Sequence, residues 1–252
     1  MSKLQRRKFN LHDKELLLAE TDNVCPVCGR RLLDEKGGKA VAQFEIAHIY
    51  PHSATDQQKK VLEGINPPSD IEALDNLIAL CRECHKRYDS FTTRDDYLKM
   101  ATLKIERRGR YEATVELSHI GIEADILEVL KDLETMDSKE FCALSMDPVP
   151  IKKKIPSGPL QIKAIALATQ YYGFLRNQFQ CMDRKRMGKF DMIAQQIKMA
   201  ALKAGQESLI QDDIFNAIVR WMFDKTNASR SSCEVVVAFF IQNCEVFSAA
   251  SQ

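Results

Sequence analysis

Hydrophobic residues recur at helical spacing through most of the chain after residue 93. Residues three or four positions apart share one face of an α-helix, so each such series predicts an amphipathic helix. The series are Ile122, Ile126, Leu130 and Leu133; Ile162, Ile165, Ala168, Tyr172, Leu175 and Phe179; Phe190, Ile193 and Ile197; and Ile214, Ile218 and Met222. Leu98, Leu103 and Ile105 mark a further helix. The C-terminal part of the chain is therefore predicted to be all-helical.

The last apolar run begins at Ser231 and continues to Phe247. Its opening Ser231-Ser-Cys-Glu234 has the Ser-x-x-Glu spacing of a capping box, which predicts the start of a helix. Three consecutive valines follow from Val235, and β-branched residues also favour strands. A helix is the prediction here, and a strand is the alternative.

The first 90 residues show short apolar runs separated by polar stretches. Val41 to Ile46 alternates between apolar and polar positions, which predicts a strand. The apolar run from Asn76 to Cys81 predicts a second strand, and the residues after Cys84 predict a helix. A long polar loop lies between Pro51 and Asp75, and long loops in compact domains often carry function.

Four prolines and a lysine run lie between Ser145 and Pro159, and they predict a linker. The predicted organisation is a domain over residues 1–92 with a basic N-terminal arm, a helical extension over 93–144, a linker over 145–160 and an all-helical, partner-binding domain over 161–252. The fold class is α+β, with the strands confined to the N-terminal domain.

The composition is that of an ordinary globular protein, with 252 residues, 45% hydrophobic content and a net charge of +1. So small a net charge gives no whole-chain argument for nucleic acid, and any such argument rests on local basic clusters. No apolar stretch reaches membrane-spanning length and the first residues are polar. We therefore expect a cytoplasmic protein without a membrane anchor.

Four of the eight cysteines form two Cys-x-x-Cys pairs, Cys25 with Cys28 and Cys81 with Cys84. Two such pairs flanking one segment can supply the four thiolates of a tetrahedral zinc site. Gly29 suits the turn that follows the first pair. The sequence therefore predicts structural Zn²⁺, and the alternatives are buried thiols or a redox pair. The scattered cysteines, Cys142, Cys181, Cys233 and Cys244, are predicted to be buried thiols.

The segment from Cys25 to Asp89 resembles the HNH nucleases of the ββα-metal class. The residues that carry the resemblance are the two cysteine pairs, His48-Ile-Tyr-Pro51, and Asn76-Leu-Ile-Ala-Leu-Cys81 followed by Cys84-His85. The resemblance implies a zinc-stapled ββα-metal domain that hydrolyses nucleic-acid phosphodiester bonds, with DNA as the expected substrate. It also implies catalytic roles for His48, Asn76 and His85.

The chemistry of hydrolysis agrees with these residue types. His48 would be the general base, since an imidazole titrates near neutral pH and can take a proton from water. His85 would bind a catalytic Mg²⁺ or Mn²⁺, which neutralises charge on the phosphate. Asn76 would hold the loop that carries His48, or assist on the metal side.

The chain departs from many HNH nucleases at position 47, where they have an aspartate and this chain has Ala47. Glu45 would face the same side of a strand as position 47, so it is our candidate for the missing metal ligand. Asp89, one helical turn after His85, is the second candidate. Loss of the carboxylate would also be consistent with an inactive nuclease.

Several basic residues are candidate nucleic-acid contacts, because phosphates orient a duplex through such side chains. They are Arg6, Arg7, Lys8, His52, Arg107, Arg108 and Arg110. The alternative is that the arginines lie on solvated helix faces and that His52 lies in a solvated loop.

The C-terminal part resembles the C-terminal module of bacterial ABC three-component conflict systems. The resemblance rests on Asp213-Ile-Phe-Asn-Ala-Ile218 and on the final run from Phe239 to Phe247. It implies an ABC-type ATPase and a small middle component as partners, with the nuclease domain as effector in anti-phage or anti-plasmid defence. A homo-oligomer is a further expectation. The alternatives are a catalytically inactive, zinc-stabilised DNA-binding or adaptor module and a stand-alone restriction or repair nuclease.

Overall fold

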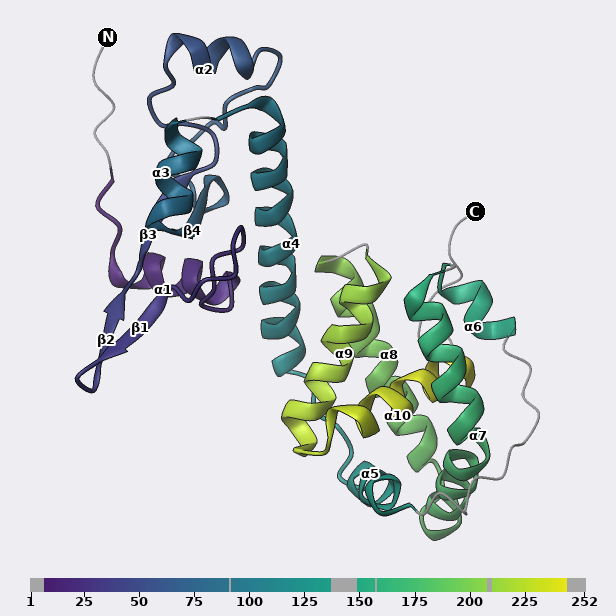
Figure 1. Cartoon of the computed structure of the whole chain (residues 1–252). Coiled ribbons are helices and arrows are strands. Elements are labelled where there is room, and N and C mark those ends of the chain that lie inside the picture. The colour runs from purple at the N-terminus through teal and green to yellow at the C-terminus, as the bar shows by residue number, and fades with distance from the viewer. Residues whose placement is uncertain (1–6, 91, 137–148, 157, 208–209, 244–252) are drawn as a thin grey trace. The chain divides into compact units, whose positions relative to one another are not determined.

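The computed structural model of the chain (Figure 1) describes residues 7–90, 92–136, 149–156, 158–207 and 210–243. It divides into two compact units, Met1–Tyr111 and Glu112–Gln252. The boundary falls inside the predicted helical extension, within helix α4 (Arg94–Ser118). Of the residues singled out in the sequence, Arg6, Cys142 and Cys244 lie outside the described ranges.

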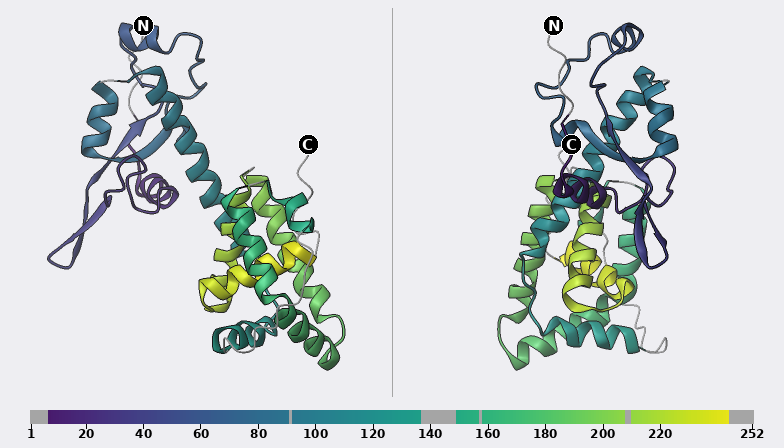
Figure 2. Two further views of the ribbon diagram at one scale, coloured as in Figure 1. Left: turned by 45° about the vertical axis from the view of Figure 1, so that its right-hand side comes forward. Right: turned by 90° about the vertical axis from the view of Figure 1, so that its left-hand side faces the viewer.

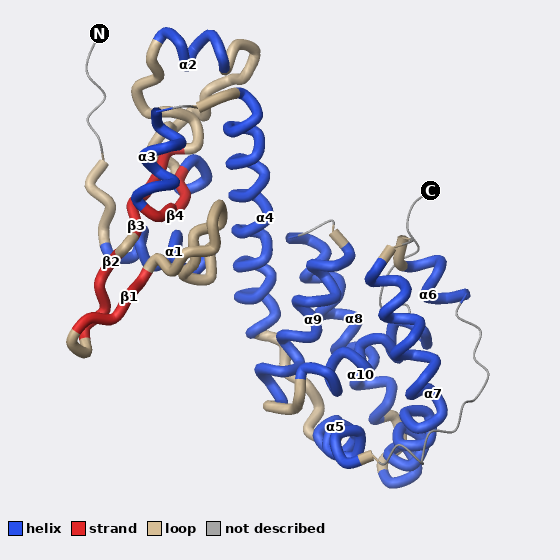
Figure 3. The backbone as a smooth tube through the Cα atoms, viewed as in Figure 1, coloured by secondary structure: helices blue, strands red, loops and turns tan. Residues whose placement is uncertain are grey.

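The N-terminal unit contains all four strands of the described chain, in two antiparallel pairs (Figure 3). Its elements are α1 (Leu11–Glu20), β1 (Leu33–Lys36), β2 (Lys39–Ala42), β3 (Phe44–His48), α2 (Asp56–Val61), the 3₁₀ turn η1 (Leu74–Asn76), β4 (Leu77–Cys81), α3 (Arg82–Ser90) and most of α4. The strand predicted over residues 41–46 proves to be the end of β2 and most of β3, separated at Gln43. The second predicted strand and the helix after Cys84 are confirmed as β4 and α3.

The first strand pair is a hairpin whose two-residue turn is Gly37-Gly38. Both glycines have positive φ, 61° and 72°, which is the backbone of a type I′ turn. Lys36 and Lys39 then face each other across the end of the hairpin.

The second strand pair and α3 form the ββα unit that the resemblance implies. Phe44 pairs with Cys81 and His48 with Leu77, so β3 delivers His48 beside the start of β4. All five residues of β4 are buried, and α3 lies against both strands (Figure 2). The Tyr88 hydroxyl on α3 donates to the carbonyl of Ile49 at 2.7 Å. This bond fixes the helix against the chain just beyond His48.

A buried ion pair joins α1 and α4 within the same unit. The Nζ of Lys104 contacts the Oε2 of Glu20, and the two side chains are 4% and 1% exposed. Burial lowers the pKa of Lys104, against the opposing effect of the Glu20 carboxylate.

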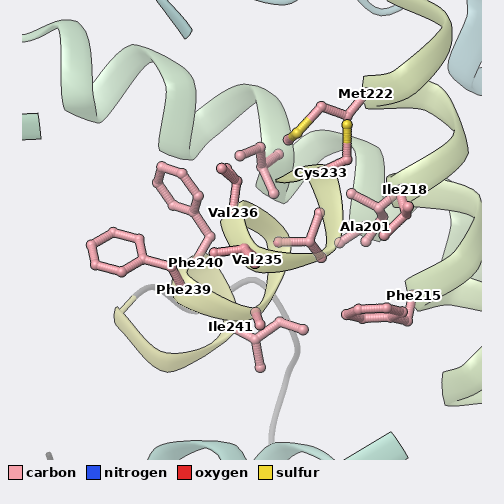
Figure 4. Packing of buried hydrophobic residues seen from close by; sticks show 14 of the residues in the cluster. Ala201, Phe215, Ile218, Met222, Cys233, Val235, Val236, Phe239, Phe240 and Ile241 are labelled. Carbon is pink, nitrogen blue, oxygen red and sulfur yellow. The ribbon is translucent and has the colours of Figure 1, made fainter. Parts of the chain in front are cut away.

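The second unit is helical throughout its described part, as predicted. Its helices are the end of α4, α5 (Ile126–Thr135), α6 (Val149–Lys154), α7 (Pro159–Lys185), α8 (Lys189–Glu207), α9 (Gln211–Thr226) and α10 (Arg230–Asn243). Helix α10 contacts each of α5 to α9. Its apolar residues are buried along its length (Figure 4). Phe239 stacks on Phe179, and Phe240 on Phe190. Because every face of α10 is covered, its sequence lacks the one-sided pattern of a surface helix.

The start of α10 differs from the sequence prediction. The segment is a helix and not a strand, but Ser229 caps it in place of Ser231. The Ser229 hydroxyl accepts from the backbone N–H of Ser232 at 3.1 Å, and the Ser229 carbonyl accepts from Cys233 at 3.1 Å. Ser229, two residues before Ser231, thus offers an equivalent cap. The capping-box spacing alone does not show which of the two serines begins the helix.

The described part of the predicted linker packs into the helical unit. Residues 149–154 form α6, and Ile151 and Ile155, one turn apart, are buried in its core. Lys154 donates from Nζ to the carbonyl of Ile241 on α10 at 2.7 Å. The prolines and lysines of this segment predict a linker. The two isoleucines at helical spacing nevertheless anchor it in the helical core.

Among the described helices, none has the combination of length and apolar character that crossing a membrane requires.

Candidate functional site

The four paired cysteines come together in the N-terminal unit. The sulfurs of Cys25, Cys28, Cys81 and Cys84 all lie within 4.8 Å of one another. The first pair sits in a tight turn in which Gly29, at φ 73°, donates to the carbonyl of Cys25 at 2.8 Å. The second pair spans the junction between β4 and α3. The cluster therefore joins the N-terminal turn to the ββα unit.

The local environment shifts the pKa values of thiols in this cluster in different directions. A hydrogen bond with the Arg30 backbone is the main cause that lowers the pKa of Cys28 to about 7. Burial raises the pKa of Cys81 and Cys84. A cation that binds thiolates removes this penalty, because metal coordination replaces the proton. Four sulfur donors at this spacing fit a tetrahedral zinc site, so the cluster has the donor set predicted from sequence.

A pocket of about 300 Å³ lies beside the ββα unit. Its walls include Arg7, His48, His52, Glu72, His85 and Asp89. Two of the three predicted catalytic residues, His48 and His85, therefore open onto one space. They reach it from different elements, His48 from the end of β3 and His85 from the first turn of α3.

His48 is mostly buried and contacts a carboxylate. Its Nε2 lies 3.2 Å from Oε2 of Glu72, and the side chains of His48 and Glu72 are 12% and 14% exposed. The ring of His52 packs edge-on against that of His48, with 5.4 Å between centroids. His48, the candidate general base, is therefore in contact with both Glu72 and His52.

Asn76, the third predicted catalytic residue, is buried, and its side chain binds backbone groups. Its Oδ1 accepts from the N–H of Tyr50 at 2.7 Å, and its Nδ2 donates to the carbonyls of Tyr50 at 3.0 Å and Ile71 at 2.9 Å. The Asn76 carbonyl accepts from Ile49 at 2.8 Å. Of the two roles expected for Asn76, these contacts favour holding the loop after His48.

His85 lies between two carboxylates. Its Nδ1 is 2.6 Å from Oε2 of Glu45, and its Nε2 is 3.2 Å from Oδ2 of Asp89. Both candidates for the missing ligand therefore reach His85, but on opposite ring nitrogens. Asp89 also lines the pocket with His48, whereas Ala47 is fully buried in the core and offers no ligand atom.

Glu72 is the site residue that sequence reasoning missed. It lies in the polar loop before η1, with no motif around it and 24 residues from His48. The expectation that His52 lies in a solvated loop is wrong, since its side chain is 5% exposed. Only the folding of the loop over β3 brings these two residues to His48.

The candidate nucleic-acid contacts are largely paired with acidic groups. Arg7 contacts Asp13 at 2.6 Å, Arg107 contacts Asp22 at 3.4 Å, and Arg108 contacts Asp75. Lys8 and Arg110 are exposed. Of Lys8 and these arginines, Arg7 lines the pocket, and a role in phosphate contact stays a prediction for all of them.

Two family models match the chain. Residues 113–247, more than half of the sequence, match C-terminal domain 11 of the ABC-three component (ABC-3C) systems. The chain belongs to this ABC-3C family. Residues 25–93 match the HNH endonuclease family, over the segment that holds both cysteine pairs and all three predicted catalytic residues. No curated protein and no solved structure matches this ABC-3C chain.

The two family matches confirm the two resemblances that the sequence shows. An ABC-3C domain implies that the chain works with other components of such a system. The HNH match adds a nuclease-type domain, and HNH nucleases use divalent metals.

Proposed function

We propose that this ABC-3C protein is a metal-dependent endonuclease that hydrolyses phosphodiester bonds in DNA and acts as the effector of a defence system. The observation that carries the proposal is the pocket that His48 and His85 share with Glu72 and Asp89. Hydrolysis of a phosphodiester needs a base for water and a cation for the developing charge, and the two histidines offer one position for each.

His48 is the general base in this proposal. Its imidazole opens onto the pocket, so it can take the proton of a water held near a bound phosphate. Asn76 acts as a positioning residue, because its hydrogen bonds join Tyr50, just after His48, to Ile71, which precedes Glu72. No ligand role is needed for its amide.

The catalytic cation would be held by His85 with Glu45 or Asp89. One imidazole nitrogen with carboxylate oxygens is a donor set that suits Mn²⁺ or Mg²⁺. Glu45 lies closer to His85, which favours it as the replacement for the aspartate absent at position 47. When bound, the cation neutralises charge on the phosphate and on the leaving oxygen.

The cysteine cluster is structural in this proposal. Cys84 directly precedes His85, so a zinc ion on the four sulfurs would fix the first turn of α3 and with it the His85 backbone. The zinc takes no part in the reaction.

The helical unit is the partner-binding part. An ABC-type ATPase and a small middle component are the partners that ABC-3C membership favours, and formation of a homo-oligomer stays a prediction. A cleavage assay on supercoiled plasmid with Mg²⁺ or Mn²⁺ tests the activity, and His48→Ala serves as the inactive control. Absence of cleavage by the unmodified protein, also with the partner ATPase added, would rule the proposal out.

A zinc-stabilised DNA-binding module without catalysis is the second candidate. The observation in its favour is Ala47, which is buried and leaves the usual carboxylate position empty of ligand atoms. Plasmid binding that is unchanged in His48→Ala, without cleavage under any metal condition, would support it. The third reading, a stand-alone restriction or repair nuclease, is disfavoured by the ABC-3C domain.

A further inference from the structure

One carboxylate lies between two imidazoles at the wall of the pocket. Oε2 of Glu72 is 3.2 Å from Nε2 of His48, and Oε1 of Glu72 is 3.1 Å from Nε2 of His52. Each oxygen of the carboxylate thus faces a different ring. All three side chains are at least 86% buried, so solvent screens these contacts little.

The backbone around Glu72 is fixed by hydrogen bonds. Its N–H donates to Oδ1 of Asp70 at 2.9 Å, and its carbonyl accepts from Arg7 at 3.4 Å. The carbonyl of Ile71, the preceding residue, accepts from the Asn76 amide, which also pairs with Tyr50. Asn76 therefore ties the loop of Glu72 to the loop that follows His48.

The contact with His52 has a different character. Nε2 of His52 and Oε1 of Glu72 are both buried and make no hydrogen bond, although they lie within ion-pair distance. Buried polar atoms of this kind need an explanation, and a role in a catalytic site is one. Nδ1 of His52 lies 3.0 Å from the Ser53 hydroxyl, which can hold the ring with Nε2 toward Glu72.

We propose that Glu72 is a positioning residue for His48. An ionised carboxylate only accepts hydrogen bonds, so the His48 nitrogen facing it carries the proton. A neutral imidazole has one protonated nitrogen, and Nδ1 of His48 is then the basic one. The carboxylate also stabilises the imidazolium that forms when His48 takes a proton.

This inference rests on the proposed nuclease function and adds to it an orienting partner for the base. The arrangement is the same in kind as an acidic residue that sets the tautomer of a catalytic histidine in hydrolases. The Glu72 carboxylate contacts the ring and not the substrate. Its loss should therefore change the rate of the chemical step more than the binding of DNA.

The kinetic test compares Glu72→Ala and Glu72→Gln with the unmodified protein in plasmid cleavage. We expect kcat to fall about 10- to 100-fold in Glu72→Ala, less than the roughly 10²- to 10⁴-fold that a general base itself contributes, because His48 is still present, with KM within about threefold. Glu72→Gln keeps a hydrogen-bond acceptor and loses the charge, so its kcat should lie between that of Glu72→Ala and that of the unmodified protein. Asp56→Asn is the matched control, because Asp56 is a 96% exposed carboxylate on α2 that pairs only with Lys59 among the ion pairs described.

The second test reads the tautomer directly and does not require activity. Ring ¹⁵N NMR on the zinc-loaded full chain should show Nε2 of His48 protonated, and Glu72→Ala should shift His48 toward a mixture of tautomers. A His48 protonated at Nδ1, or a tautomer unchanged in Glu72→Ala, would overturn the inference. Unchanged helix content and zinc content establish that each variant folds.

The two tests separate this inference from the function on which it rests. Cleavage by the unmodified protein together with unchanged kcat in Glu72→Ala overturns the role of Glu72 and leaves the nuclease intact. Absence of cleavage by the unmodified protein overturns the nuclease and the catalytic role of Glu72 with it. The NMR result then still decides whether Glu72 sets the tautomer of His48.

Discussion

Asn76 pairs with the backbone of Tyr50 in both directions, accepting from its N–H at 2.7 Å and donating to its carbonyl at 3.0 Å. This pair closes the loop that leaves β3 directly after His48. The same amide reaches the carbonyl of Ile71. The asparagine is thus a clamp between two loops, each of which carries a residue of the candidate site.

Replacing Asn76 by alanine should loosen both loops. Three side-chain hydrogen bonds of about 1 kcal/mol each are lost, so we expect the N-terminal unit to be destabilised by about 3 kcal/mol. Differential scanning calorimetry measures this as a lower Tm for one transition. Hydrogen exchange should rise at residues 49–52 and 70–73 and stay constant in α7 to α10. Asp34→Ala, in the exposed hairpin strand, is a control that should leave both measurements unchanged.

Glu45 should matter more than Asp89 for binding of the catalytic cation. We expect Glu45→Gln to weaken Mn²⁺ binding at least about 10-fold, since loss of even an outer-shell partner at a metal site costs about that much, and Asp89→Asn to weaken it less. Electron paramagnetic resonance of free Mn²⁺ gives the affinity without any activity assay. The reverse order would assign the ligand to Asp89, which lines the pocket together with His48.

Zinc should be needed for the fold of the N-terminal unit and not for that of the helical unit. We expect Cys84→Ser to lose the zinc and with it the calorimetric transition of the N-terminal unit, because metal binding supplies folding energy directly. Elemental analysis gives the metal content, and far-ultraviolet circular dichroism should retain the signal of α5 to α10. Cys181→Ser on α7 is the control. Full zinc content in Cys84→Ser would contradict the four-sulfur site.

The local features of the site could be predicted from sequence, because each is set by neighbours in the chain. Cysteine spacing determines the sulfur pairs, and Cys84 places His85 next to the cluster. Alternation along β3 puts Glu45 on the side of position 47, and Glu45 does contact His85. These relationships need only strand and helix geometry.

What the sequence could not show depends on tertiary packing. Glu72 and His52 meet His48 only because the segment between β3 and η1 folds back to the end of the strand. The charges of Arg107 and Arg108 resemble a nucleic-acid surface in sequence, yet each contacts an aspartate from a distant segment. In the same way, the isoleucines of α6 are recognised as core only when α10 is present to cover them.

The buried pair of Lys104 and Glu20 gives a prediction on stability and pH. Removing one partner leaves a buried charge, so Glu20→Leu alone should cost about 3–5 kcal/mol, whereas adding Lys104→Met to it should recover most of that loss. Chemical unfolding of the unmodified protein and the two variants measures the difference. If the double variant is as unstable as Glu20→Leu, the ion pair does more than offset the cost of burying its two charges, and it stabilises the fold.

The pH dependence follows from the lowered pKa of Lys104. Between that lowered value and the ordinary 10.5 of a lysine, the unfolded chain binds more protons than the folded one. Stability from this group therefore increases as the pH rises through that window, and below it the burial penalty is present in full. Many other groups titrate in the same range, so the measured quantity is the difference in Tm between the unmodified protein and Lys104→Met. As the pH is raised toward 10.5, the Tm of the unmodified protein should rise relative to that of Lys104→Met. A constant difference between the two Tm values would contradict the lowered pKa of Lys104.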